Sequence, residues 1–513
     1  MNGTAVLIVS VLILVTLALT FYAARRNKSA DDHYVAGGRV SGWQNGLALA
    51  GDQLSAASFL GITGAVALTG FSGFYLAVGV PAAYLLMLLV IAEPLRNLGR
   101  YTLADAVAAR FEGRGLRTAM AVAGLVISII YMVIQFVGAG LLAQLLLGVG
   151  FPTAVIVIGV LMTVYTILGG MVGTTYIQIF KAVLLIVTAL TLLVLVTAET
   201  GGNPIGSMQD AAARFGDGVI APHHGDTLKS VDTVSLTLGM VLGMMGLPHI
   251  MVRFLTVRDG RAARDSAQVA MWIFAAFFAA LPIFGYAALN EVGRADIVAD
   301  NKAGNLAAPR LAEAVGGNLL FSITAAVVMV TILAVLAGLA IATSGAIAHD
   351  LYTTVLKRGE VSPRRQLVVG RLAGVAVSVV AILLALWAKT LNIAFLGNVA
   401  FAVAASTTMP VLVLTIYWRG LNRIGAVAGL VGGLVASVGL VLAGPDVMGD
   451  SHLFPLSIPA LVSVPFGFLC AWGASLATRG NADAAGSPYD ELARRAFPVR
   501  GRRAVRPVPE TSA

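Results

Sequence analysis

The chain has 513 residues, of which 58% are hydrophobic and only 12% are charged, whereas about 25% of the residues are charged in a typical soluble domain. A soluble protein of this size needs far more charge to cover its surface, so soluble enzymes, nucleic-acid-binding proteins and secreted disulfide-rich proteins are excluded. The mean hydropathy is +0.89, and apolar runs recur that are long enough to cross a bilayer, which indicates a membrane protein with many spans.

Thirteen apolar stretches have the length of a membrane-spanning helix. The first is followed at once by Arg25, Arg26 and Lys28. A cleavable signal peptide carries its positive charge in front of the apolar stretch, so we expect this helix to be retained. The predicted spans are 5–24, 42–69, 74–95, 118–147, 151–170, 173–197, 233–252, 266–290, 318–349, 367–388, 393–418, 423–444 and 455–478.

The basic residues, which give a net charge of +9, predict the orientation. With the N-terminus outside, 27 of the 34 lysines and arginines fall in inside segments, six fall in outside loops, and Lys181 falls within a span. Lys and Arg are concentrated on the inner side of membranes, so we predict an outside N-terminus and an inside C-terminus. The tail, 479–513, is predicted to be a disordered cytoplasmic segment, although Tyr489 to Phe497 has the pattern of one amphipathic helix.

Several classes of activity lack their motifs. The sequence contains no nucleotide-binding loop, metal-ligand cluster or kinase motif, and its single cysteine, Cys470, cannot form an intrachain disulfide. ATP-driven pumps and fused kinases are therefore excluded, and we expect neither an enzyme nor a cofactor other than a possible coupling Na⁺. A secondary transporter, a channel and a passive sensor remain.

Two spans contain residues that interrupt helices. Residues 51–58 place a glycine, a carboxylate, an amide and two hydroxyls in mid-membrane, and residues 239–248 contain three glycines and a proline. Transporters bind substrates at such interruptions because unwound backbone exposes N–H and C=O groups. The two spans begin successive groups of five, which is where an inverted repeat has its broken helices.

Asp52 is the most informative residue of the first interruption. An acidic side chain at membrane depth costs at least about 2.5 kcal/mol on insertion scales, which favours a functional role. The alternative is a structural cap for the half-helix that starts at Ser55, since a carboxylate satisfies free N–H groups there. For Ser55 and Ser58, hydroxyls at an anion-binding helix start and small residues at a helix contact fit the pattern equally well.

Lys181 is the second unusual residue, because it lies about eight residues into its span, roughly 12 Å at the helical rise of 1.5 Å per residue. In one interpretation its side chain extends back to the interface. In the other it is a fixed positive charge inside the bundle, where another transporter would hold a metal cation. His249 is interpreted as structural, and Glu93 and Asp350, at inside ends, are predicted to form interface ion pairs.

With these residues in view, the chain resembles the sodium:solute symporter family, and within it the cation/acetate (monocarboxylate) permeases. The resemblance implies an all-α, leucine-transporter-type fold, in which spans two to eleven (about 42–418) form a 5+5 inverted repeat. One helix precedes this core and two follow it, in a single transmembrane domain of residues 1–478. The resemblance rests on residues 51–61, 98–105, 169–171, 246–249, 337–339 and 349–352.

The resemblance also implies a cation site made of backbone carbonyls at the first break and hydroxyls on the eighth core helix. The carbonyls fall on Gly51 and Leu54. The hydroxyl positions fall on Ala334 and Val335, which have none, so Thr331 is the nearby substitute. A possible sodium site is therefore formed by Gly51, Leu54 and Thr331.

Three further positions depart from the family pattern. An acidic residue of the family falls on Gln178 and a glutamine falls on Lys181, and these two residues share a helical face. Proline-transporting members carry an acid at the position of Gln53, whereas here the acid is Asp52. We assign Gln178 and Lys181 to cation coupling, with Lys181 either replacing the cation permanently or taking up and releasing a proton.

The resulting hypothesis is a symporter of the bacterial plasma membrane that imports a short-chain monocarboxylate, such as acetate or propionate, by alternating access coupled to H⁺ or Na⁺. No nucleic acid and no obligatory protein partner is expected. The alternatives are a transporter of the same fold for proline, pantothenate, a sugar or urea, and a passive channel or sensor. The predicted substrate-binding residues are Asp52, Gln53, Ser55, Ala56, Ala57 and Ser58, of which Asp52 and Gln53 organise the break.

Overall fold

The computed structural model describes residues 3–24, 30–111, 113–222, 227–358, 360–390, 393–478 and 489–498. Regular structure in these ranges is helical, apart from one isolated bridge between Val40 and Val257. Eleven helices in them are long and apolar enough to span a bilayer, and two shorter apolar helices lie at Ser58–Thr69 and Phe151–Thr163. These segments fall on the thirteen predicted stretches, while the number of crossings and the orientation stay predictions.

The helices of the first half are α1 (Gly3–Ala24), α2 (Ala30–Val35), α3 (Gly42–Gln53), α4 (Ala56–Thr69), α5 (Phe71–Val90), α6 (Ala92–Leu98), α7 (Leu103–Ala108), α8 (Arg114–Leu147), α9 (Phe151–Glu199) and α10 (Gly206–Phe215). Those of the second half are α11 (Thr227–Gly243), α12 (Pro248–Leu255), α13 (Gly260–Glu291), α14 (Arg294–Asp300), α15 (Ala307–Gly345), α16 (Pro363–Trp387), α17 (Ile393–Ser406), α18 (Thr408–Tyr417), α19 (Arg423–Leu442), α20 (Pro445–Met448), α21 (Ala460–Ala477) and α22 (Tyr489–Ala496).

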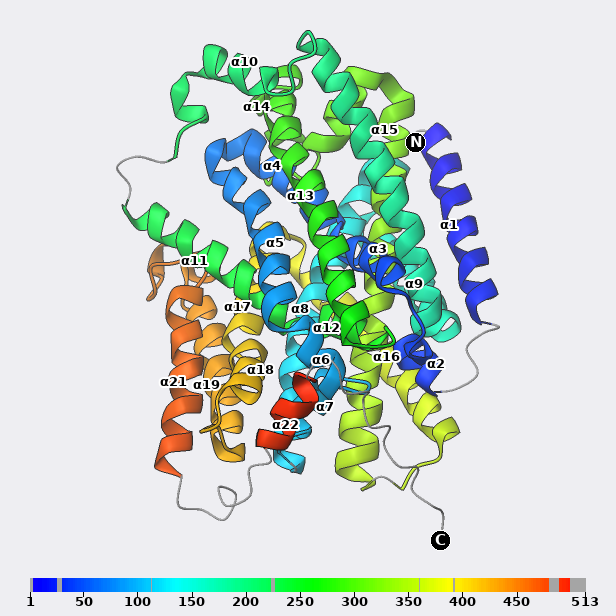
Figure 1. The fold of residues 1–513 in the computed structure, drawn as a ribbon. Helices are drawn as coiled ribbons and strands as arrows, with labels where there is room; N and C mark the ends of the chain where they lie inside the picture. The colour runs from blue at the N-terminus through cyan, green and yellow to red at the C-terminus, as the bar shows by residue number, and fades with distance from the viewer. Residues whose placement is uncertain are drawn as a thin grey trace.

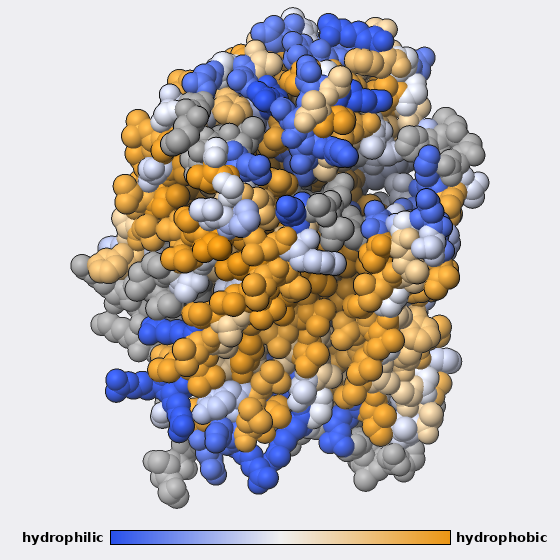
Figure 2. All heavy atoms as spheres, turned by 180° about the vertical axis from the view of Figure 1, so that it is seen from behind, coloured by the Kyte–Doolittle hydropathy of each residue, from blue (hydrophilic) through white to orange (hydrophobic). Residues whose placement is uncertain are grey.

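The long helices run between two ends of the molecule, one carrying α10 and α14 and the other carrying α7 and α22 (Figure 1). We call these the α10 end and the α22 end; the basic residues predict that the α22 end is inside. Helix α1 begins at the α10 end and α21 finishes at the α22 end (Figure 1), as an odd number of crossings requires. Figure 2 shows a broad hydrophobic belt between two more hydrophilic ends, which is the surface that a bilayer covers.

The second predicted span is divided into α3 and α4. Leu54 (φ −69°, ψ 77°) and Ser55 (φ −111°, ψ 172°) leave the helical conformation, and the Ser58 hydroxyl accepts a hydrogen bond from the Ser55 N–H (2.9 Å). A Cβ atom on Gly51 would collide with the backbone carbonyl of Gln178, so α3 can touch α9 here only through a glycine. The break leaves the first N–H groups of α4 without helical partners.

The seventh predicted span is divided into α11 and α12, which are joined by one tight turn, η3 (Met244–Gly246). Leu247 is extended (φ −75°, ψ 116°), and Pro248 begins α12, where its missing N–H costs no hydrogen bond. Thr408, the first residue of α18, donates to the buried carbonyl of Gly246 (2.7 Å). Helix α12 contacts α3, so the two interrupted spans meet inside the bundle.

Three details differ from the expected boundaries. The stretches 151–170 and 173–197 join in one helical segment, α9, because their short link is itself helical. Gly317 (φ 65°) interrupts α15 just before the stretch that begins at 318. In the tail, α22 occupies the stretch with the amphipathic pattern and packs on α6 and α18; most of the remaining tail lies outside the described residues.

Candidate functional site

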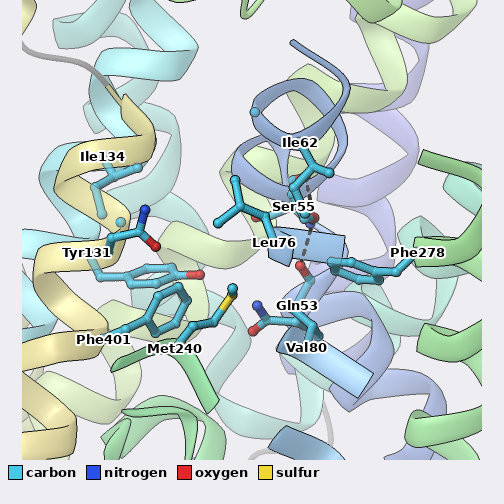
Figure 3. A pocket seen from close by; sticks show the side chains of 14 residues that line it. Gln53, Ser55, Ile62, Leu76, Val80, Tyr131, Ile134, Met240, Phe278 and Phe401 are labelled. Carbon is cyan, nitrogen blue, oxygen red and sulfur yellow. Dashed lines mark hydrogen bonds between the residues drawn. The ribbon is translucent and has the colours of Figure 1, made fainter. Parts of the chain in front are cut away.

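A cavity of about 60 Å³ lies beside the first break, between α4, α5, α8, α11, α13 and α17 (Figure 3). Sites for drug-sized ligands measure about 300–1,000 Å³, so this cavity suits only a small solute. Its apolar wall includes Val80, Met240, Phe278 and Phe401. The polar lining consists of Gln53, Ser55, Ser58, Tyr131 and Asn398.

Some polar atoms of the cavity have no protein partner. The Ser55 hydroxyl oxygen and Oε1 of Gln53 are buried and make no hydrogen bond with the described residues. The Tyr131 hydroxyl points across the cavity toward these two residues (Figure 3), and its ring packs against His249 and Phe401, with centroids 4.9 and 6.0 Å away. Buried polar groups are nearly always hydrogen-bonded, so these atoms indicate a place for a polar ligand.

A buried ion pair joins the two interrupted spans next to this cavity. Arg253 of α12 donates through Nε to Oδ2 of Asp52 (2.6 Å) and through Nη1 to the Thr175 hydroxyl (2.8 Å). Gln178 donates to Oδ1 of Asp52 (2.5 Å). Asp52 and Arg253 are only 3% and 1% exposed. The carboxylate is tolerated at this depth because it is paired and hydrogen-bonded.

The ion pair lies close to two cavities. Gln53, the neighbour of Asp52, lines the cavity at the break. Thr175, the partner of Arg253, lines a second cavity of about 260 Å³, which extends to Arg39 and the start of α3. This second cavity is lined by α2, η1 (Ala36–Gly38), α3 and α9, of which α2 lies toward the α22 end (Figure 1). Each cavity is therefore lined by a residue that contacts the pair or neighbours it in the chain.

Lys181 makes a second polar contact one turn further along α9. Lys181 is fully buried, and its Nζ donates to the backbone carbonyl of Thr331 on α15 (3.2 Å). Gln178 also donates to a carbonyl of α15, that of Ala334 (3.0 Å). The first interpretation of Lys181 is therefore wrong, since its side chain stays inside the bundle and does not extend to the interface.

The buried charges at the break do not cancel. Arg253 and Lys181 are two basic side chains, whereas Asp52 is one acidic side chain beside them, and all three residues are buried. An uncompensated buried charge is costly, so the described part of the site favours a negatively charged ligand.

The predicted substrate-binding residues occupy two places. Gln53, Ser55 and Ser58 line the cavity, and Asp52 lies beside it in the ion pair. The other two, Ala56 and Ala57, begin α4, and their side chains lie outside the described part of the structure. The assignment of these residues to the substrate remains a prediction.

The predicted cation-coupling residues lie where α3, α9 and α15 meet. Gln178 and Lys181 donate to α15, where Lys181 contacts Thr331. Gly51 packs on the backbone of Gln178, and Leu54 is a residue of the break itself. Their role in coupling also remains a prediction.

The structure also shows the contacts of Glu93, Asp350 and His249, the three other residues singled out in the sequence. Glu93 pairs with Arg264 (3.3 Å), and Asp350 pairs with Arg117 (3.1 Å), so both predicted ion pairs are present. His249 packs against Tyr131, and neither of its ring nitrogens has a hydrogen-bond partner among the described residues.

Sequence reasoning missed Tyr131, Asn398 and Arg253 as parts of the site. Tyr131 lies in an uninterrupted span, and Asn398 lies in a span with only a single glycine beside it, so neither has a strong local signal. Arg253 directly follows the predicted span 233–252 and counts there only as one of the basic residues of the inside segments. Its position five residues after Pro248, just beyond a helix break, is the signal that could have found it.

Comparisons with known proteins agree with this architecture. The profile of the sodium:solute symporter family matches residues 33–433. The uncharacterized symporter YwcA of Bacillus subtilis (strain 168) is 45% identical over 484 residues, which cover 92% of this chain and 94% of that protein. A monocarboxylic acid transporter of Corynebacterium glutamicum is 38% identical over 490 residues, which cover 90% of this chain and 89% of that protein.

A solved structure shows the same fold. The chain matches a Na⁺-coupled sialic acid symporter, solved in a substrate-bound outward-open state, with a TM-score of 0.74 at 15% identity, over 92% of this chain and 98% of that one. The fold is thus of the leucine-transporter type, as the resemblance implied. A multi-pass location in the bacterial plasma membrane accords with the apolar helices and the bacterial relatives. The chain belongs to the sodium:solute symporter family.

Proposed function

We propose that the protein is a secondary symporter that imports a short-chain monocarboxylate, such as acetate or propionate, together with H⁺ or Na⁺. The observation that carries this proposal is the small cavity at the first break, where free polar atoms of Gln53 and Ser55 face the Tyr131 hydroxyl. The C. glutamicum relative, which is named a monocarboxylic acid transporter, supports the same class of substrate.

A short-chain monocarboxylate has a charged end and a small apolar end, and the cavity offers partners for both. The N–H groups at the start of α4 carry a partial positive charge, and the hydroxyls of Ser55 and Tyr131 can donate to carboxylate oxygens. Met240, Phe278 and Phe401 supply an apolar surface for the alkyl end. The excess positive charge beneath the cavity adds to the attraction of an anion.

Transport also requires a path to the inside. The Asp52 neighbour Gln53 lines the cavity at the break, and the Arg253 partner Thr175 lines the second cavity. We infer that a movement of α3 relative to α12 parts the pair of Asp52 and Arg253 and joins the two cavities. Alternating access in such folds is largely a rigid-body movement of one group of helices against the other around a fixed site.

Uptake of radiolabelled acetate by proteoliposomes tests the proposal. The wild-type protein should accumulate acetate under an imposed pH or Na⁺ gradient and should exchange it in counterflow. Ser55→Ala and Tyr131→Phe should each weaken apparent affinity about tenfold or more, because a hydrogen bond to a charged group is worth about 1.5–3 kcal/mol. Ser437→Ala is the matched control, since this buried hydroxyl bonds only within α19.

Two outcomes would overturn the proposal. Counterflow with proline, pantothenate, a sugar or urea, without exchange of any monocarboxylate, would assign the same fold to another solute. Equilibration of acetate that never exceeds the outside concentration under either gradient would indicate a passive channel.

A further inference from the structure

The ammonium of Lys181 is unusual because it is buried and, among the described residues, has no carboxylate in contact. It donates to the backbone carbonyl of Thr331, 3.2 Å away. The nearby acid, Asp52, is already engaged by Arg253 and Gln178. A charged group inside a membrane protein is costly and by default functional, so the position of this ammonium needs an explanation beyond helix packing.

Helix α9 presents two nitrogen donors to one row of carbonyls. Gln178 and Lys181 are three residues apart on α9, and their acceptors, the carbonyls of Ala334 and Thr331, are three residues apart on α15. On the other side, the backbone of Gly51 packs against Gln178. The donors therefore lie at the junction of α9, α15 and the C-terminal end of α3.

This junction has the features that attract a cation. The C-terminal end of a half-helix carries a partial negative charge, and transporters of inverted-repeat folds coordinate Na⁺ with such ends and with unwound carbonyls. The chain belongs to a family that is named for the symport of sodium with a solute. A positive charge placed here satisfies the same electrostatic demand, whether a metal ion or a side chain supplies it.

The groups present at the junction do not suit sodium. The Thr331 and Ala334 carbonyls accept bonds from nitrogen donors, and an ammonium in the first shell would repel a second cation. Two buried oxygens, the Thr331 hydroxyl and Oε1 of Gln178, have no partner among the described residues. An ammonium beside these oxygens already supplies the positive charge that a sodium ion would otherwise bring to them.

We propose that the Lys181 ammonium is a built-in cation that holds α9 to α15 beside the first break in place of sodium, so that this protein works without binding sodium there. For transport, the inference rests on the proposed function: if no sodium binds at the junction, the proton is the coupling ion of the proposed symport. It concerns the junction of α3, α9 and α15, however, and not the recognition of the monocarboxylate.

The first test uses purified full-length protein and needs no substrate. Binding of radioactive sodium and thermal unfolding are measured in NaCl and in choline chloride, for wild type, Lys181→Ala and the control Lys302→Ala, whose lysine is exposed. We expect the wild type and the control to bind no sodium above background and to unfold at the same temperature in both salts. Saturable sodium binding by the wild type would overturn the proposal.

Chemical rescue is the second test. Lys181→Ala should unfold at a lower temperature than Lys302→Ala, and ammonium or methylammonium, which fit the space left by the side chain, should reverse this loss, whereas choline should not. An unchanged unfolding temperature in Lys181→Ala, or equal rescue by choline, would contradict the built-in cation. If Lys181→Ala does not fold, Lys181→Met retains the volume, and the wild-type sodium measurement still decides.

Acetate uptake separates this inference from the proposed function. Accumulation driven by a pH gradient and indifferent to sodium supports both. Accumulation that strictly requires sodium supports the proposed function and overturns the inference. Absence of acetate exchange, together with absence of sodium binding, rejects the monocarboxylate and leaves the built-in cation standing.

Discussion

Asp52 and Arg253 are 201 residues apart in the sequence, yet Nε of Arg253 lies 2.6 Å from Oδ2 of Asp52. Asp52 is near the end of α3 and Arg253 is in α12, so one buried ion pair joins the two interrupted spans. The movement proposed above would give this pair a gating role in addition to its structural role, and the two roles can be separated by mutation.

Asp52→Asn should destabilise the protein by about 3–5 kcal/mol, because it leaves a buried arginine without its counter-charge. Arg253→Gln should have a similar cost, and the double variant should recover part of it. Unfolding of the purified variants measures these changes, with the exposed acid Asp210→Asn as the control. A double variant no more stable than the worse single variant would show that the charges do not interact.

Met240→Ala should change the preferred chain length of the substrate. Met240 lines the cavity at the break, and its replacement by alanine makes room for a longer alkyl chain. Each methylene of substrate that a hydrophobic pocket accommodates is worth about 1–3 kcal/mol of selectivity. The ratio of butyrate to acetate counterflow should rise about tenfold or more. Met87→Ala removes the same volume from a buried position outside the cavity lining, and an equal change in that control would show that the effect is not local.

Arg117→Met should destabilise the α22 end by about 3 kcal/mol. Arg117 pairs with Asp105 of α7 (2.9 Å) and with Asp350 of the π-helical segment η4, Ala346–Leu356 (3.1 Å). Its loss leaves two carboxylates close together without the arginine that bridges them. Chemical unfolding compares this variant with Arg365→Met, whose arginine is exposed. Equal stability of the two variants would mean that solvent already screens these charges.

Asp105 should make stability depend on acid pH. Burial by itself raises the pKa of this carboxyl. The hydrogen bonds from His349 and from the Tyr101 N–H, together with the charges of His349 and Arg117, outweigh burial and hold the pKa below its usual range. A depressed pKa stabilises the fold above the unfolded value of about 4, and this contribution is lost as pH falls below it. The denaturant midpoint of unfolding is measured between pH 6 and pH 3, and it should fall less in Asp105→Asn than in the wild type. The expected size is about 1 kcal/mol of stability for each unit by which the pKa is shifted.

Arg110→Lys should loosen α22 even though the charge is kept. Arg110 donates to the Thr415, Trp418 and Arg419 carbonyls at the end of α18, and its guanidinium lies 4.8 Å from the ring centroid of Tyr489. Burial lowers the pKa of Arg110 to about 10, so it stays charged at neutral pH. A lysine cannot reproduce the planar fork that reaches several carbonyls.

Hydrogen exchange measures this effect. Because a helix of eight residues is marginal on its own, amides 489–496 should exchange faster in Arg110→Lys and in Tyr489→Ala than in the wild type. Arg494→Lys, on the exposed face of α22, is the control. Protection of α22 that is unchanged in Arg110→Lys would show that its other contacts, such as the bond from Asn97 to Ala496 (2.9 Å), are sufficient.

The sequence by itself determined the spans and the two breaks. Both depend on local properties: the length of apolar runs, the absence of side chains on glycine and the missing N–H of Pro248. The extended conformation at Ser55 and Leu247 follows from residues within a few positions of each break. Gln53, Ser55 and Ser58 were accessible to the same reasoning, because polar groups at a break mark a site wherever the rest of the chain lies.

Tertiary structure alone decided the partners. Whether Lys181 reaches the interface depends on what covers α9, and the covering helices α3 and α15 come from distant parts of the chain. Tyr131 and Asn398 line the cavity because α8 and α17 pack around the break, which no local pattern encodes. Long-range packing decides which group lies next to each buried charge. It therefore determines that these unusual residues form an ion pair, line a cavity and place an ammonium against α15.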